Sequence, residues 1–303
     1  MKRSVRLPAF AKINLCLHVV GRLPDSFHEL RTIFQSISLH DTLELKLSSR
    51  KEITLEIDDP RLPADSTNLV WRAIDALRRE LGLRQGVHAK LTKVIPVARG
   101  LGGGSSDAAA ALTGLLRLTR RRLPLPRLVE IAAGLGADVP FFLFGGRALG
   151  VNRGDEIYPL PDAPRRIILV VSPHDIGVST EDAYTWLDQR LSMSRRLTKP
   201  AATHRIWGFC ALCWSRQDGG ISNDFEAAVF RRHPRLAKIK RALLQGGAAE
   251  AALAGSGSAV FGVFRNPAQA RRVARAFPKD QVFVVRTLSR EDCRGVMSQR
   301  AIV

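Results

Sequence analysis

The sequence has little cysteine, few aromatic residues and no long apolar run. Its 303 residues contain four scattered cysteines, and aromatic residues make up 6% of the chain. Four scattered cysteines are too few for a disulfide framework, which favours a reducing compartment. No apolar run approaches the roughly 18 to 20 residues that a membrane span needs. We therefore expect neither a disulfide-stapled mini-protein nor a membrane partner.

Metal-binding and targeting patterns are scarce as well. Cys210 and Cys213 form a CxxC pair, but no second CxxC or Cys/His pair completes a zinc site. The basic N-terminus continues into an apolar segment that Lys12 and Asn14 interrupt, which makes a poor signal peptide. The sequence thus predicts a cytoplasmic protein, and its cysteine and histidine spacing assigns no metal-ligating residues.

Acidic residues are few relative to basic ones. Lysine and arginine number 47 and aspartate and glutamate 28, so the formal net charge at pH 7 is +19. Such a chain is expected to meet polyanions, whether nucleic acid, an anionic membrane surface or phosphorylated small molecules. Runs such as 120–122 fall at expected helix ends and surfaces, where basic side chains are ordinarily solvated, and no DNA- or RNA-binding module is present. A nucleic-acid-binding protein is therefore a minor alternative, and we expect no specific nucleic-acid partner.

Length and composition predict two ordinary folded domains. Hydrophobic residues make up 45% and charged residues 25%, as in typical soluble proteins, and the length suits two domains of about 150 residues each. A proline-rich stretch at 159–164 is interpreted as the junction, which gives domains of residues 1–160 and 161–303. Residues 190–220 show no clean period and are interpreted as irregular chain or a surface insertion.

Hydrophobic periodicity predicts strands and helices in both halves, and therefore an α+β fold. The expected strands are 11–20, 43–47, 53–57, 87–95, 141–144, 167–171, 249–253, 259–264 and 281–285, with a hairpin turn at 152–154. The expected helices are 68–81, 108–118, 126–135, 180–187, 223–230, 234–244 and 267–276.

The expected strand at 11–20 has an unusually polar second face. Alternation places Lys12, Asn14, Cys16 and His18 together, opposite an apolar face. An interior strand rarely carries four polar side chains on one side, so this face is a candidate wall of a functional site.

A glycine-rich loop stands between an expected strand and a strong helix. Four of the five residues from 100 to 104 are glycine, which allows the backbone to approach a ligand closely. The start of a helix presents unpaired N–H groups and a positive dipole end, which bind anions. Ser105 and Ser106 follow at positions expected of helix N-caps. The pattern predicts a phosphate-binding loop.

This loop matches none of three common nucleotide patterns. A Walker A loop requires a lysine after its glycines, and none follows here. Gly100, Gly102 and Ser105 come close to the dinucleotide pattern G-x-G-x-x-G without completing it. The glycine loop, HRD and DFG set of the protein kinases is absent. The loop therefore indicates a nucleotide-binding protein outside these three classes.

Three segments resemble motifs of the GHMP kinases, the family of galactokinase and of homoserine, mevalonate and phosphomevalonate kinases. Segment 96–109 (PVARGLGGGSSDAA) resembles their ATP loop, 8–15 (PAFAKINL) their N-terminal strand, and 253–258 (LAGSGS) their C-terminal glycine motif. Segments 21–30, 136–142, 177–180 and 223–226 resemble the branch of the family that phosphorylates a cytidine diphosphate-linked methylerythritol.

Two residues depart from the family pattern. Ser26 replaces a glycine before the Phe27–His28 pair, so that turn is expected to sit differently. Arg99 replaces a glycine or alanine in the loop and is expected either to contact a phosphate or to point into solvent.

The resemblance implies a fold and an activity. The implied fold is a two-domain α+β GHMP-kinase-like architecture, with an N-terminal ribosomal-protein-S5-domain-2-like nucleotide domain and a C-terminal ferredoxin-like α/β sandwich. The implied activity is ATP- and Mg²⁺-dependent phosphorylation of the 2-hydroxyl of the methylerythritol compound, in the non-mevalonate pathway of isoprenoid (terpenoid) biosynthesis. The implied partner is this small molecule, and the expected assembly is a monomer or a homodimer. Another small-molecule kinase of the same family is the nearer alternative.

The resemblance also implies roles for individual residues. Asp138 would act as the base, with Lys12 as its cationic partner. Ser105 or Ser106 would help to hold Mg²⁺. The ATP-binding residues would be Pro96, Val97, Ala98, Arg99, Gly100, Leu101, Gly102, Gly103, Gly104, Ser105 and Ser106.

The implied substrate site is a slot for the cytosine ring. Phe27 would provide one wall and Tyr184 the other, because a pyrimidine stacks well on aromatic rings. His28 would hydrogen-bond the base edge or the backbone around it. The substrate-binding residues would be Asn14, Phe27, His28, Thr180, Tyr184, Gly255, Ser256 and Gly257.

Overall fold

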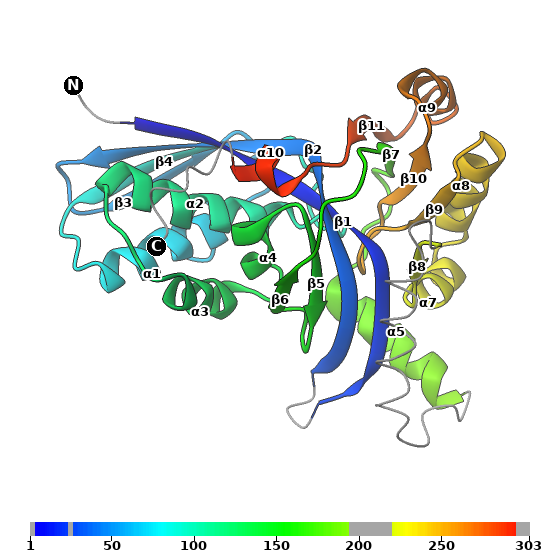
Figure 1. Cartoon of the computed structure of the whole chain (residues 1–303), viewed down its shortest axis with the longest axis horizontal. Coiled ribbons are helices and arrows are strands. Elements are labelled where there is room, and N and C mark those ends of the chain that lie inside the picture. Colours follow the sequence, from blue (N-terminus) through cyan, green and yellow to red (C-terminus); the bar gives the residue numbers. More distant parts are fainter. Residues whose placement is uncertain (1–3, 24–26, 194–219, 295–303) are drawn as a thin grey trace.

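The computed structural model describes residues 4–23, 27–193 and 220–294, and the side chains of 191–193 are not part of this description. Within these ranges the strands form two sheets, each with its own helices (Figure 1). The predicted α+β class and two-unit architecture are confirmed. Most of the interval 190–220, including Cys210 and Cys213, lies outside the described residues, as does Ser26.

The N-terminal sheet has the strand order β3-β4-β2-β1-β8, and β5 and β6 continue from β2 as a hairpin. Most neighbours are antiparallel, but β3 runs parallel to β4 and β8 runs parallel to β1. The hairpin between β5 and β6 turns where 152–154 was expected to turn. The strands are β1 (Ser4–Arg22), β2 (His28–Ser48), β3 (Ile53–Ile57), β4 (Gly86–Thr92), β5 (Arg147–Val151), β6 (Glu156–Pro159) and β8 (Ser222–Asn223).

Strand β1 is not regular, and its irregularity changes which side chains face the site. A register shift against β2 lies between Asn14 and Cys16, and one extra residue in a strand moves the following side chains to the other side. Lys12, Asn14 and Leu17 therefore line one cavity, whereas Cys16 and His18 line another. The prediction that four polar residues share one face is wrong.

Helices cover one face of this sheet (Figure 1). Helix α2 follows the glycine loop and is almost wholly buried against β1 and β2, because alanine and leucine fill it. Gly114 lets it approach the sheet, since a Cβ there would come within 2.6 Å of the Leu7 Cδ1 atom. The helices are α1 (Leu69–Glu80), α2 (Gly103–Thr119), α3 (Leu125–Leu135) and α4 (Val139–Phe144).

Two local predictions in this domain are wrong. Residues 141–144 were expected as a strand but form the end of α4, which has a proline in its first turn and ends at Gly145 with a φ of 64°. A short apolar run carries no period that separates a buried strand from a buried helix. Ser105 and Ser106 are not N-caps, because α2 begins earlier and its N-cap is Gly102.

The C-terminal sheet has the strand order β11-β7-β10-β9, with all neighbours antiparallel. Numbered within this domain, the order is 4-1-3-2, which is the ferredoxin-like arrangement that was expected. Its elements are β7 (Ile167–Ser172), α5 (Thr180–Met193), α7 (Glu226–Arg232), α8 (Pro234–Gln245), β9 (Glu250–Leu253), β10 (Val260–Phe264), α9 (Pro267–Ala274), β11 (Gln281–Arg286) and α10 (Arg290–Arg294).

The two units also contact each other outside the junction at 159–164. Strand β8, which precedes α7, pairs with β1 of the N-terminal sheet. After β11, Thr287 forms a bridge with Ile37, and the Leu288 N–H donates to the Ser36 carbonyl at 2.9 Å. The boundary between residues 160 and 161 stays a prediction. None of the helices in the described ranges is both long and apolar enough for a bilayer span.

Candidate active site

A cavity of about 870 Å³ lies between the two domains, and it is lined by both predicted catalytic residues and most of the predicted substrate-binding residues. Its walls come from β1, β2, the segment before α4, the hairpin after β5, helix α5 and the turn after β9. The predicted residues that line it are Lys12, Asn14, Phe27, His28, Ser105, Asp138, Thr180, Tyr184, Gly255 and Ser256. Gly257 does not line this cavity, and of the predicted ATP-binding residues 96–106 only Ser105 does.

Lys12 and Asp138 form an ion pair at the wall of this cavity. The Lys12 Nζ atom lies 3.3 Å from the Asp138 Oδ2 atom. The Lys12 residue is 4% exposed, whereas the Asp138 side chain is 34% exposed. Asp138 occupies the N-cap position of α4, yet its side chain makes no capping hydrogen bond. The carboxylate is therefore held by the lysine and turned toward the cavity, which a simple capping role does not explain.

A chain of hydrogen bonds fixes the lysine from behind. The Lys12 Nζ donates to the Asn14 Oδ1 at 2.9 Å, and the Asn14 Nδ2 donates to the Thr32 Oγ1 at 2.7 Å. The Thr32 hydroxyl in turn donates to the Cys16 carbonyl at 2.8 Å. All of these groups are buried, so each bond acts at low local dielectric and restricts the next side chain. Asn14 thus orients Lys12 as well as bordering the cavity.

The far end of the cavity carries the aromatic residues. The Phe27 ring is 56% exposed and lies under the Arg153 guanidinium, whose carbon is 4.2 Å from the ring centroid. The rings of His28 and Tyr184 stack with centroids 4.4 Å apart and an angle of 19° between their planes. The His28 Nε2 lies 2.8 Å from the Asp188 Oδ1.

This arrangement refines the predicted slot. Phe27 and Tyr184 line the same cavity, but His28 covers one face of the Tyr184 ring. Burial raises the pKa of the Tyr184 hydroxyl, with smaller contributions from the negative charges of Asp138 and Asp188. The Tyr184 hydroxyl therefore stays neutral, and the ring is covered on one face by His28 instead of being freely exposed for stacking.

The glycine loop adopts left-handed backbone conformations, which glycine takes up without strain. The backbone φ angle is 79° at Gly100 and 72° at Gly102, and Ala98 has a φ of 56°. A Cβ atom at Gly102 would lie 2.7 Å from the Phe142 ring and 3.0 Å from the Lys12 Cγ. The Lys12 N–H donates to the Leu101 carbonyl at 2.9 Å. The loop thus passes directly against the lysine strand and leaves room only for glycine at position 102.

Arg99 does not simply point into solvent, and its contact with a phosphate stays a prediction. Its Nη1 donates to the Ser258 Oγ at 2.8 Å, and its Nη2 donates to the His174 carbonyl at 3.2 Å. Both partners belong to the C-terminal domain. Arg99 therefore links the glycine loop to the second domain, and burial lowers the pKa of its guanidinium.

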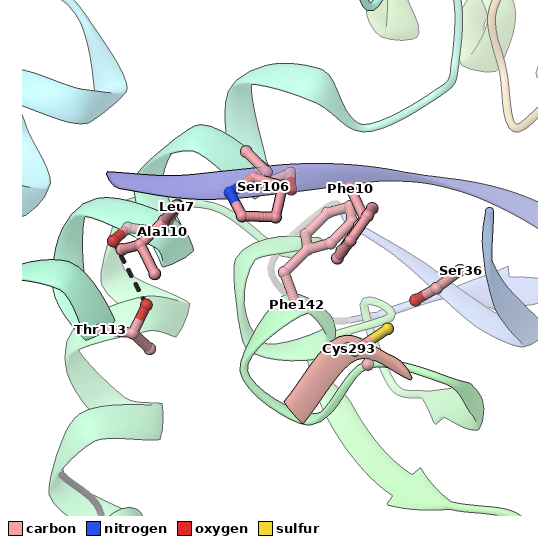
Figure 2. A pocket seen from close by; sticks show the side chains of 11 residues that line it. Leu7, Phe10, Ser36, Ser106, Ala110, Thr113, Phe142 and Cys293 are labelled. Carbon is pink, nitrogen blue, oxygen red and sulfur yellow. Dashed lines mark hydrogen bonds between the residues drawn. The ribbon is translucent and has the colours of Figure 1, made fainter. Parts of the chain in front are cut away.

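The two loop serines face different sides of α2. Ser105 lines the large cavity, whereas Ser106 lines a small pocket behind β1 with Phe10, Phe142 and Cys293 (Figure 2). That second pocket has a volume of about 20 Å³, which holds about one water molecule. Of the two serines, only Ser105 is placed beside the Lys12–Asp138 pair.

Sequence reasoning missed a buried charge cluster beneath the glycine loop. The Lys93 Nζ lies between the carboxylates of Asp41 and Asp107, at 2.7 Å from the Asp107 Oδ2, and all three side chains are buried. Asp41 also accepts the backbone N–H groups of Val94 and Ile95. Burial raises the pKa of Asp107 to about 7. The cluster joins β2, the loop and α2, and the only sequence signal was Asp107 at the end of the glycine motif.

Other residues of the cavity were also missed. Arg22, Arg153 and Asp188 line it beside Phe27 and His28. Arg22 Nη2 lies 3.2 Å from Asp188 Oδ2. Nothing in their spacing points to a site, because they come from a strand end, a hairpin and a helix that only the tertiary structure brings together.

Comparison with known proteins places the chain in a family. Residues 68–146 match the family described as GHMP kinases N terminal domain, and residues 211–282 match GHMP kinases C terminal. The 4-diphosphocytidyl-2-C-methyl-D-erythritol kinase of Solibacter usitatus is 46% identical, covering 97% of this chain and 92% of its own length. The kinase of that name from Thermodesulfovibrio yellowstonii is 38% identical, with coverage of 92% and 96%.

Solved structures agree with this placement. A crystal structure of 4-(cytidine 5'-diphospho)-2C-methyl-D-erythritol kinase superposes with a TM-score of 0.75 at 32% identity, covering 93% of this chain and 99% of that one. The homoserine kinase from Cytophaga hutchinsonii superposes with a TM-score of 0.73 at 22% identity over 95% of this chain and 96% of that one, which shows the shared fold. The chain therefore belongs to the 4-diphosphocytidyl-2-C-methyl-D-erythritol kinase family, a branch of the GHMP kinases.

Proposed function

We propose that the protein transfers the γ-phosphate of ATP to the 2-hydroxyl of 4-diphosphocytidyl-2-C-methyl-D-erythritol, a step of the non-mevalonate isoprenoid pathway. The observation that carries the proposal is the Lys12–Asp138 pair, 3.3 Å apart on the wall of the interdomain cavity. Phosphoryl transfer needs a positioned nucleophile, neutralised charge and a base or orienting group near the hydroxyl. The Lys12–Asp138 pair supplies the neutralising charge and the base at one place.

Asp138 takes the role of the group that accepts the hydroxyl proton. Its side chain is partly exposed to the cavity and uses no bond for capping α4, so oxygen lone pairs are available to a substrate hydroxyl. Lys12 holds this carboxylate in place and offers a positive charge to the transferring phosphoryl group. The buried Asn14–Thr32 chain keeps the lysine pointing at the carboxylate rather than into solvent.

The glycine loop takes the role of the phosphate cradle. Its positive φ angles and the start of α2 fit the unpaired N–H groups that bind phosphate oxygens. Mg²⁺ fits this site as an ion held mainly by phosphates, since no three His, Cys, Asp or Glu side chains in the described ranges gather as metal ligands. Ser105 is the loop hydroxyl that would reach it. When bound, the ion neutralises phosphate charge.

The cytidine end of the substrate binds at the end of the cavity that carries Phe27, His28 and Tyr184. Phe27 offers an exposed ring for stacking, and His28, held by Asp188, offers a ring edge for hydrogen bonding. Thr180, Gly255 and Ser256 border the same cavity, and the Ser256 Oγ donates to the Thr180 Oγ1 at 3.2 Å. An acceptor without an aromatic ring, such as mevalonate, homoserine or galactose, would leave this end empty.

An ADP-release assay with Mg-ATP tests the proposal. We expect turnover with 4-diphosphocytidyl-2-C-methyl-D-erythritol and none with mevalonate, homoserine or galactose. The Asp138→Asn variant should lose about 10²- to 10⁴-fold in kcat, while the exposed Asp182→Asn variant should match the wild type. Turnover with a control acceptor alone would instead support another kinase of the family, and undiminished turnover in Asp138→Asn would refute the assigned base.

A further inference from the structure

The segment Asn223–Glu226 (NDFE) was singled out in the sequence, yet the proposed function gives it no role. It starts in β8 and leads into α7. Asn223 was expected in a helix but pairs with Leu17 of β1 in the parallel ladder. It is buried and does not line the large cavity. A role for Asn223 must therefore act through its neighbours.

The side-chain amide of Asn223 bonds to three backbone groups. Its Nδ2 donates to the Leu253 carbonyl at 2.9 Å and to the Gly255 carbonyl at 2.7 Å. Its Oδ1 accepts the Phe225 N–H at 3.0 Å. An asparagine amide offers two donor hydrogens and one acceptor oxygen, so every kind of bond it can make is used. The amide ties the end of β9 and the turn after it to β8, which pairs with β1.

Glu226 makes a second tie from the same segment. Its Oε1 accepts the Leu253 N–H at 2.9 Å, and its Oε2 accepts from the Lys240 Nζ at 2.6 Å. The N–H and the carbonyl of Leu253 are therefore both held by side chains of the NDFE segment. The end of β9 is anchored before the chain enters the turn 254–257.

This turn packs directly against the catalytic elements. A Cβ atom at Gly255 would lie 3.2 Å from the Lys12 Nζ and 3.0 Å from the Gly100 carbonyl oxygen. A Cβ atom at Gly257 would lie 2.2 Å from the Gly100 nitrogen. The Ala259 N–H donates to the Arg99 carbonyl at 3.2 Å. With contacts this close, a shift of the turn must also shift the glycine loop or the lysine.

We propose that Asn223 is a positioning residue that sets the turn 254–257, and through it the glycine loop and the Lys12 ammonium. The amide satisfies the two carbonyls with its two donor hydrogens and the Phe225 N–H with its oxygen. Aspartate has the same shape but, when ionised, turns an oxygen toward those carbonyls instead of donors. The kinetic part of this inference rests on the proposed function, whereas its structural part does not.

The test is the Asn223→Asp variant, examined in the full-length protein at pH 6 to 8. At pH 8 we expect kcat to fall about 10- to 100-fold and KM for ATP to rise, since two buried carbonyls lose their donors. The ratio of variant to wild-type kcat should recover as the pH falls, because a protonated aspartate again donates one hydrogen bond. Asn266→Asp, at the N-cap of α9, makes the same chemical change and still accepts from the Gln269 N–H. It should leave activity and its pH profile unchanged.

Hydrogen–deuterium exchange of the proteins without substrate gives a readout that does not depend on catalysis. The amides of Ala254, Gly257, Ala259 and Lys12 are hydrogen-bonded in or against the turn and loop, and at pH 8 they should exchange faster in Asn223→Asp than in Asn266→Asp. If Asn223→Asp does not fold, Asn223→Ser, which keeps one donor, should show the same pattern more weakly. Unchanged exchange at these amides would overturn the inference. A wild-type protein without turnover would refute the proposed function, and exchange alone would then decide the positioning role.

Discussion

At Lys12 the protein buries a positive charge, and the surroundings show why. A buried ammonium is costly unless it is paired and hydrogen-bonded. Here the Asp138 carboxylate and the Asn14 amide oxygen provide that pairing. Because Asp138 remains partly exposed, the pair faces the cavity as well as the core. A lysine needed only for stability would be replaceable by an apolar residue, which suggests a direct test.

We expect the Lys12→Met variant to lose catalysis while keeping its fold. Methionine fills a similar volume without the charge, and the Asp138 carboxylate that loses its partner is 34% exposed, so water can solvate it instead of leaving a buried unpaired charge. Turnover should fall about 10²- to 10⁴-fold, with a thermal unfolding midpoint close to that of the wild type. Lys46→Met is the control, because Lys46 forms an exposed pair with Glu44 on β2. If the turnover of Lys12→Met stays within threefold of the wild type, Lys12 takes no part in catalysis.

His18 makes the stability of the protein depend on pH. Hydrogen bonds with Asp224 and then with Cys16 raise the pKa of His18 from 6.5 to about 10, although burial opposes this. When a histidine has a higher pKa in the folded state, its stabilising effect is complete below pH 6.5 and disappears as the pH rises toward 10. His18 thus supports the contact between β1 and the NDFE segment mainly at neutral and lower pH.

We expect the His18→Gln variant to have a flatter stability profile. Urea unfolding at pH 6.5, 8 and 10 should show that the free energy of unfolding of the wild type falls over this range by more than that of His18→Gln. Other groups that titrate in this range remain in both proteins, so the difference between the profiles isolates His18. Parallel profiles would show that the imidazole has no raised pKa in the folded state.

At the scale of elements, backbone geometry decides where side chains go. The register shift in β1 sends Lys12 and Asn14 to one cavity and Cys16 to another. The left-handed Gly102 starts α2 directly beside Lys12 and Phe142. A side chain at Gly102 therefore meets two obstacles, the backbone conformation and the packed neighbours.

A pair of glycine variants separates these two obstacles. Gly82 has a φ of 61° and nothing within 4 Å of an added Cβ, whereas Gly102 has a φ of 72° and two contacts of 3.0 Å or less. Gly82→Ala should cost about 1 kcal/mol of folding free energy through strain alone and leave turnover unchanged. Gly102→Ala should cost more and also lower kcat, because Lys12 must move. Equal stability and activity of the two variants would contradict the packing argument.

At the scale of the whole molecule, two domains meet around the cavity. The chain carries a formal net charge of +19 at pH 7. Many of the basic side chains form exposed ion pairs, such as Arg127 with Glu80, which contribute little to stability. The excess positive charge attracts anions in general, including nucleotides, at long range. Such attraction is screened by salt and carries no sequence preference.

We expect the protein to bind DNA without specificity at low salt and to release it at physiological salt. With 6 to 10 phosphate contacts, affinity falls by about 10³- to 10⁵-fold between 50 mM and 200 mM salt. Fluorescence anisotropy with two duplexes of unrelated sequence would measure this, and ADP release should be unaffected by the DNA at 200 mM salt. Sequence-selective binding that persists at 200 mM salt would favour the nucleic-acid alternative.

The glycine loop, the lysine strand and the segment before α4 were predictable from the sequence, because each is a local pattern whose chemistry lies in a few consecutive residues. Tertiary structure alone decided which side chains share a cavity. The register shift in β1 separated Cys16 from Asn14, and the packing of α2 decided that Ser105 rather than Ser106 faces the large cavity. Arg99 and Asn223 found partners far away in the chain. The direction of a side chain depends on strand register and long-range packing, which no short stretch of sequence contains.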